Sequence, residues 1–264
     1  MTYQEQHLSS SAFQALDRIR ATAYQSVDEA YGVGHAAADL AIATPLAYHN
    51  GHHTRTVAEG ARKMAAALGL SAAESAVSVT AGAAHDLIQL KPRGVMEQES
   101  AEWLETAFRE AGIPQWAQRA GSLAILGTEP LFSEDGRLVG QKVSELDFVS
   151  HSERDIAHSV ACADMSQIHD RFGPLYGHQL YAEIKAVSLL EEPPLDGLLP
   201  FQRRQAELAA TYRYPNATGE AVFGARRAAV AAYQAELAVK LERGDITSWH
   251  GVIGADLAFA AAQS

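Results

Sequence analysis

The chain has 264 residues, 47 % of them hydrophobic, and a formal net charge of -11 from 32 acidic and 21 basic residues. A chain of this length can bury a sizeable core without disulfides, and its single cysteine, Cys162, excludes an intramolecular disulfide. The acidic balance argues against a nucleic-acid-binding surface, which needs clustered Lys and Arg, but it is compatible with a small phosphorylated substrate.

The N-terminal residues 1–11 are polar and lack the apolar segment of a signal peptide. No stretch approaches the ~20 apolar residues of a membrane helix. We therefore expect a soluble, cytoplasmic protein that binds no membrane. Cys162 stands between two alanines, and we expect it to be a small buried hydrophobe.

Helical periodicity dominates the chain, and alanine, the strongest helix former, is abundant, so we predict an all-α fold. Ser10 or Ser11 can cap the first helix, and Ser71 with Glu74 forms a capping box. Glycine and proline mark the helix ends. The predicted helices run from Ser10 or Ser11 to Gly32, through a short Ala-rich segment ending near 44–45, and then over about 48–68, 71–88, 97–111, 114–126, 152–171, 175–191, 198–212, 219–243 and 251–262.

The stretch 127–140 contains Pro130 and Asp135-Gly136 but few periodic apolar residues. It is predicted to be a loop without a strand, long enough to cover an active site. The sequence shows no internal repeat and no flexible linker. We therefore predict one domain over residues 1–264, with a core at about 47–172 and a C-terminal helical elaboration at about 173–264.

Three separated patterns offer metal ligands. His49 and His53 are four residues apart, which places them on one face of a helix. His85 and Asp86 provide a nitrogen and an oxygen side by side, and Asp164 has apolar neighbours, among which an unpaired carboxylate is costly. Such mixed ligands suit Mn, Fe, Co, Ni, Zn or Mg. Spacing alone also allows the ordinary alternative, in which these histidines are surface or core residues with hydrogen-bond partners.

The combination of motifs resembles the HD-domain superfamily of metal-dependent phosphohydrolases. The opening motif is also similar to that of cyclic-nucleotide phosphodiesterases, which share the helical fold. The resemblance covers roughly residues 47–172 and implies an HD-domain or phosphodiesterase-like helical bundle. The motifs that carry it are Tyr48-His49-Asn50-x-x-His53, Ala84-His85-Asp86, Glu99-Ser100-Ala101, Ile125-x-Gly127-Thr128 and Ala163-Asp164.

The resemblance also implies roles for individual residues. The superfamily's metal ligands match His53, His85, Asp86 and Asp164. His49 matches the general acid of the phosphodiesterase branch, a role that suits an imidazole of near-neutral pKa. The alternative for His49 is a residue that orients a metal ligand. His52 is expected to be a neighbour of the site only.

Two-metal branches of the superfamily place extra histidines where His151 and His158 stand in this sequence. His158 is six residues before Asp164, and this spacing turns it away from Asp164 on a regular helix. We therefore expect a single metal, with a two-metal site as the alternative.

A phosphoryl substrate needs positive charge near the metal. Lys91 and Arg93 follow the His-Asp pair and could reach over the site. Lys91 is the better candidate and joins His49 and Asp86 in the predicted catalytic set. Arg55 is two residues past His53, so we expect it to be a solvated surface charge.

The resemblance implies a hydrolase that uses one divalent metal to activate water against a phosphate ester. The expected substrate is a small nucleotide or another phosphomonoester. Two alternatives remain: an HD-type di-iron oxygenase, and a non-catalytic ligand-binding domain that keeps the metal for stability. The apolar stripe on the predicted helix over 219–243 is expected to be either core or an oligomer face, so a homo-oligomer is possible.

Overall fold

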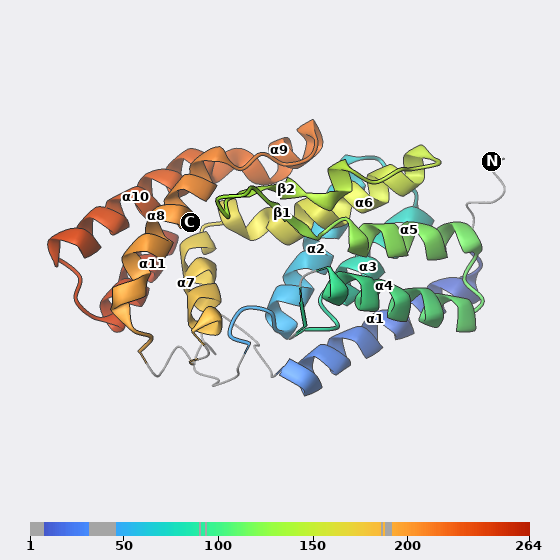
Figure 1. Cartoon of the computed structure of the whole chain (residues 1–264). Helices are drawn as coiled ribbons and strands as arrows, with labels where there is room; N and C mark the ends of the chain where they lie inside the picture. The colour runs from blue at the N-terminus through green and yellow to red at the C-terminus, as the bar shows by residue number, and fades with distance from the viewer. Residues whose placement is uncertain (1–7, 32–45, 90, 93, 186, 188–191) are drawn as a thin grey trace.

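The computed structural model describes residues 8–31, 46–89, 91–92, 94–185, 187 and 192–264. It confirms the all-α prediction, because the described residues are mainly helical (Figure 1). None of the described helices is long and apolar enough to cross a membrane. The predicted Ala-rich helix ending near 44–45 lies outside the described residues. The α-helices are α1 (Ser10–Tyr31), α2 (Gly51–Ala67), α3 (Ala72–Ala84), α4 (Val95–Glu110), α5 (Gln115–Leu126), α6 (His151–Asp164), α7 (Gly173–Ile184), α8 (Leu198–Thr211), α9 (Ala217–Phe223), α10 (Arg227–Arg243) and α11 (Trp249–Ala262).

Helix α2 packs against both α3 and α6, and these three helices form the centre of the larger part of the molecule. Figure 1 shows α8, α10 and α11 gathered at the opposite end from α1, α4 and α5. A small apolar cluster connects the two ends, because Met64 of α2 and Cys162 of α6 pack with Tyr212 and Tyr214, which follow α8. Cys162 is fully buried, as expected from its neighbours.

The starts of α2 and α3 follow from single capping residues. The Asn50 side-chain oxygen accepts hydrogen bonds from the backbone N–H groups of His52 and His53, so Asn50 ends the preceding turn and begins α2. Ser71 and Glu74 form the predicted capping box at the start of α3. Asn50 in the opening motif therefore stabilises the start of the helix that carries His53.

Four of the predicted helices are too long. The prediction 71–88 stops at Ala84, 152–171 stops at Asp164 and 175–191 stops at Ile184. The prediction 219–243 is wrong as a single helix, because a 3₁₀ turn at Gly224–Arg226 separates α9 from α10. Apolar spacing continues through these breaks, so periodicity alone does not locate them.

The prediction that 127–140 contains no strand is wrong. Strands β1 (Pro130–Phe132) and β2 (Leu138–Gln141) form a two-stranded antiparallel hairpin with an irregularity near Phe132. Asp135-Gly136 lies in its turn, and Gly136 has a φ of 77°, which glycine adopts without strain. The strands are too short to produce a visible two-residue alternation, which explains the wrong prediction.

Gly60 allows α2 and α6 to approach closely. A Cβ atom at this position would lie 2.9 Å from Ala163 Cβ, next to Asp164. Alanine in a helix is normally favoured over glycine by up to about 1 kcal/mol, but overpacking costs about 1–3 kcal/mol. We therefore expect Gly60→Ala to lower the free energy of unfolding by about 1 kcal/mol or more in urea titration.

Gly254 of α11 provides a matched control, because a Cβ there would meet no described atom within 4 Å. Gly254→Ala is expected to leave stability unchanged or to raise it by up to about 1 kcal/mol. Equal stabilisation by both substitutions would contradict the close approach of α2 and α6.

Candidate metal centre

The ends of three helices bring the predicted ligands together. His53 lies in the first turn of α2, His85 directly follows α3, and Asp164 is the last residue of α6. His53 and His85 are almost fully buried, whereas Asp86 and Asp164 keep 18 % and 17 % of their side chains exposed. The cluster therefore has a buried side, formed by the two imidazoles, and a side that solvent can reach.

The distances within the cluster are short. Asp86 Oδ2 lies 3.1 Å from His53 Nε2 and 3.0 Å from His85 Nε2. Asp164 Oδ1 lies 3.4 and 3.6 Å from the same two nitrogens, which are 3.3 Å apart. Two ligand atoms about 2.1 Å from one cation, at 90–110° to each other, would be about 3.0–3.4 Å apart. The cluster has nearly this spacing, and His53, His85 and Asp164 are close enough to hold a metal ion together.

The hydrogen bonds on the outer side of the imidazoles determine which nitrogen faces the cluster with a lone pair. His85 Nδ1 donates to the Gly82 carbonyl oxygen at 2.8 Å, and His53 Nδ1 donates to Gln167 Oε1 at 3.1 Å. A neutral imidazole with its proton on Nδ1 offers a lone pair at Nε2. If both Nε2 atoms carried protons, two donors would oppose each other at 3.3 Å.

Asp86 Oδ2 is buried and accepts no hydrogen bond from the described residues despite its two close nitrogens. A buried carboxylate oxygen without a donor is costly. Two lone-pair nitrogens and an oxygen without a donor, all facing one point, suit a cation at that point. With neutral imidazoles the four side chains carry two negative charges, which match a divalent ion.

The pKa shifts agree with this excess of negative charge. Burial raises the pKa of Asp86, but the charge of His85 and the proximity of His53 outweigh burial and hold that pKa well below its usual range. Burial lowers the pKa of His53, but the contacts with Asp164 and Asp86 raise it to about 9. Burial raises the pKa of Asp164, but its contacts with His53 and His85 lower it below its ordinary value. Both carboxylates thus stay ionised, and the cluster attracts positive charge, either protons or a metal cation.

The turn that presents Asp86 is fixed by α4. The predicted helix over 71–88 ends before His85, so His85 and Asp86 do not lie on a regular helix and can reach the same point. Ser100 Oγ accepts a hydrogen bond from the backbone N–H of Ile88 at 3.1 Å. The Glu99-Ser100-Ala101 motif therefore helps to hold the turn after the His-Asp pair.

His49 lies beside the cluster and is held by Glu183 of α7. Its Nδ1 donates to Glu183 Oε1 at 2.5 Å, and the other carboxylate oxygen accepts the backbone N–H groups of Tyr48 and His49. The ring centroids of His49 and His53 are 5.7 Å apart. Burial lowers the pKa of His49, but the Glu183 hydrogen bond and nearby Asp86 raise it above its ordinary value.

Lys91 and Arg55 pair with carboxylates outside the cluster. Lys91 pairs with Glu99 at 2.5 Å near the surface, so its contact with a substrate stays a prediction. Arg93 lies outside the described residues. Arg55, predicted to be a solvated surface charge, is partly exposed and forms an ion pair with Asp28 at 2.5 Å.

Two of the other histidines considered for the site have partners outside the ligand cluster. His52 Nε2 contacts the Tyr176 hydroxyl at 3.2 Å, consistent with a neighbour of the site. His151 is the first residue of α6, roughly 20 Å along the helix axis from Asp164 at 1.5 Å per residue. His158 contacts Asn216 at 3.0 Å. This placement argues against a second metal that uses His151 or His158.

Several residues near the cluster were missed by sequence reasoning. Each acts through side-chain hydrogen bonds over a long sequence separation, and no local pattern signals such bonds. Only Gln141 had an indirect signal, the Asp135-Gly136 turn, which could have indicated the strand that ends at Gln141. The missed residues are Gln141, Gln167, Glu183 and Tyr212.

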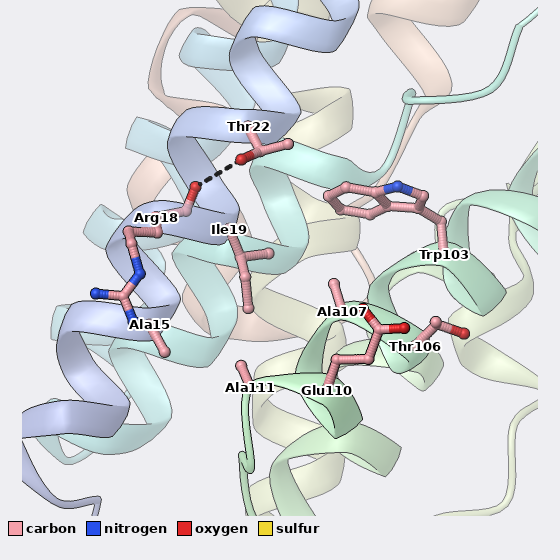
Figure 2. A pocket seen from close by; sticks show the side chains of 9 residues that line it. All are labelled: Ala15, Arg18, Ile19, Thr22, Trp103, Thr106, Ala107, Glu110 and Ala111. Atoms are coloured by element: carbon pink, nitrogen blue, oxygen red, sulfur yellow. Dashed lines mark hydrogen bonds between the residues drawn. The ribbon is translucent and has the colours of Figure 1, made fainter.

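A cavity of about 320 Å³ lies between α1 and α4, away from these residues (Figure 2). Its lining includes Trp103, Ile19, Arg18 and Glu110, and none of the ligand side chains belongs to it. This volume is at the lower end for small-molecule pockets. The lining holds no pair of groups suited to metal binding or proton transfer, so the metal cluster remains the candidate site.

Comparison with known proteins shows similarity in fold. No protein-family model matches the sequence, and no curated protein matches it. Among solved structures, a structural genomics target from Lactobacillus plantarum is similar to this chain with a TM-score of 0.53 and 13 % identity, covering 90 % of this chain and 100 % of that one. At this identity the likeness concerns the fold alone. Because it extends over most of the chain, the shared fold includes C-terminal helices.

Proposed function

We propose that this chain is a metal-dependent phosphohydrolase of the HD type that cleaves a small phosphomonoester, such as a nucleotide. The observation that carries the proposal is the convergence of two imidazole Nε2 atoms and two carboxylate oxygens within 3.0–3.6 Å. Their order along the chain matches the ligand motifs of the superfamily that the sequence resembles. Phosphate-ester hydrolysis is the chemistry to which such a ligand set is suited.

The metal would be held by His53, His85, Asp86 and Asp164. A bound divalent cation supplies Lewis acidity toward a phosphoryl oxygen and lowers the pKa of a water molecule. The residues themselves provide the fixed frame, because Gly82 and Gln167 hold the two imidazole rings with Nδ1 directed outward.

His49 would donate the proton that the leaving oxygen requires. Its Nδ1 is engaged by Glu183, so Nε2 is the nitrogen that can transfer a proton. The raised pKa of His49 keeps the ring protonated over more of the neutral range. Attack of water on phosphorus and cleavage of the P–O bond then leave the proton on the departing alcohol.

The two alternatives are separated by different observations. A di-iron oxygenase would need additional histidine ligands, but His151 begins α6 at the far end from Asp164 and His158 contacts Asn216. A non-catalytic binding domain would keep the same ligands, so only an assay can distinguish it.

The test is release of inorganic phosphate by purified protein loaded separately with Mn²⁺, Co²⁺, Ni²⁺, Zn²⁺ or Mg²⁺. The substrates are nucleoside monophosphates, sugar phosphates and a chromogenic phosphate ester. We expect at least one combination to exceed the Asp164→Asn variant by about 100-fold or more, which also excludes a contaminating phosphatase. Exposed Asp147→Asn is the charge-matched control and should retain wild-type activity.

Wild-type activity equal to that of Asp164→Asn with every metal and substrate would refute the hydrolase proposal. Two irons per chain together with oxygen uptake would favour the oxygenase instead.

A further inference from the structure

The two oxygens of Asp164 have different partners. Oδ1 faces the imidazoles of His53 and His85, at 3.4 and 3.6 Å. Oδ2 accepts a hydrogen bond from Gln141 Nε2 at 3.2 Å. Gln141 is the last residue of β2 and is only 1 % exposed, so this contact is shielded from water.

A second hydrogen bond fixes the orientation of the Gln141 amide. The Tyr212 hydroxyl, just beyond the end of α8, donates to Gln141 Oε1 at 3.1 Å. Because that oxygen must accept, the amide NH₂ group is directed to acceptors, namely Asp164 Oδ2 and, at 3.4 Å, the Thr128 carbonyl oxygen. Hydrogen bonds are thus donated in one direction, from Tyr212 to Gln141 and from Gln141 to Asp164.

We propose that Gln141 and Tyr212 are positioning residues of the metal centre, which hold Asp164 so that Oδ1 alone is presented to a divalent cation. This inference rests on the proposed function. A neutral amide donor occupies one carboxylate oxygen without neutralising the charge, unlike a Lys or Arg partner. Loss of a hydrogen bond that orients a metal ligand in this way typically changes metal affinity by about 10–100-fold.

This series of hydrogen bonds also gives the C-terminal helices a role at the metal centre. Gln141 comes from the hairpin and Tyr212 from the C-terminal segment, whereas Asp164 ends a helix of the central group. Metal binding and docking of the segment after α8 are therefore coupled through one amide. Thermodynamic reciprocity requires that loss of this docking contact weakens metal binding and that metal binding stabilises the contact.

The test compares Tyr212→Phe with Tyr214→Phe. Both tyrosines are 5 % exposed and lie in the same apolar cluster, but the Tyr214 hydroxyl contacts His169 Nδ1 at 3.1 Å instead of Gln141. Calorimetric titration with Co²⁺ should show binding weakened about 10-fold in Tyr212→Phe and changed by less than about 2-fold in Tyr214→Phe. The visible spectrum of bound Co²⁺ should change only in Tyr212→Phe.

Gln141→Met, which keeps the side-chain length but removes the hydrogen bonds to Tyr212, Asp164 and Thr128, should weaken Co²⁺ binding by about 10–100-fold. Unfolding midpoints show whether the variants are folded. Equal Co²⁺ affinity and spectra in Tyr212→Phe, Tyr214→Phe and wild type would overturn the positioning role. Failure of wild type to bind Co²⁺ would overturn the metal centre as well, whereas Co²⁺ binding without hydrolysis would contradict only the proposed activity.

Discussion

Asp86→Asn is expected to remove the metal from the purified protein while leaving the fold intact. The substitution keeps the shape of the side chain but replaces the anionic oxygen that lies 3.0–3.1 Å from both imidazoles. The charge offered to a cation falls from two negative units to one. Elemental analysis should find about one equivalent of a divalent metal in wild type and almost none in the variant.

Thermal unfolding provides an independent measurement of the same loss. A ligand present at about 100 times its dissociation constant stabilises the folded state by about 2.7 kcal/mol. For a protein of this size we therefore expect a chelator to lower the wild-type Tm by roughly 5 °C. The Tm of Asp86→Asn should not respond to the chelator, because no bound metal remains to be removed.

Asp147→Asn changes the charge by the same amount at an exposed position and should behave like wild type in both measurements. If Asp86→Asn kept a full equivalent of metal, Asp86 would not be a ligand. If wild type itself contained no metal and took none up, the cluster would be an assembly of ion pairs between imidazolium and carboxylate groups.

Much of the helical framework could be predicted from local chemistry. Ser71 with Glu74 signals the start of α3, and the helical spacing of apolar residues locates most of the other helices. Helix ends were predicted less well where no strong stop signal was recognised. Asp164 is the clearest case, because α6 ends there and a 3₁₀ turn over Met165–His169 continues in its place.

The convergence of the ligands could be anticipated only through the order of the motifs. His53, His85 and Asp164 lie far apart in the sequence, and neither periodicity nor propensity determines which helix ends meet. The side chains that orient them were beyond sequence reasoning for the same reason. Glu183 follows the buried Tyr181 and Ala182 on α7, and nothing in that helix indicates that its carboxylate holds His49.

His49→Gln is expected to lower kcat by about 10²–10⁴-fold without loss of the metal, because it removes the group proposed to protonate the leaving oxygen. His52→Gln is the matched control. His52 lies three residues further along the same segment. Its imidazole contacts Tyr176 and lies outside the proposed ligand set. Metal content should be unchanged in both variants, which separates proton donation from metal binding.

Glu183→Gln tests how the proton is held on His49. The carboxylate contributes to the raised pKa of His49 through its hydrogen bond at 2.5 Å and its charge. A group that must be protonated supports activity below its pKa, and activity declines as the pH rises through that pKa. Because a neutral amide stabilises imidazolium less, the alkaline decline of kcat/KM should move to lower pH in Glu183→Gln.

The same substitution should reduce kcat at neutral pH by about 10–100-fold, since the ring is also held less firmly. In His49→Gln the alkaline decline that belongs to His49 should disappear. Glu236→Gln, at an exposed ion pair with Lys240 on α10, should leave the pH profile unchanged. An unshifted profile in Glu183→Gln would exclude His49 as the titrating acid, because the closest charged partner of the ring would then have no influence on its proton.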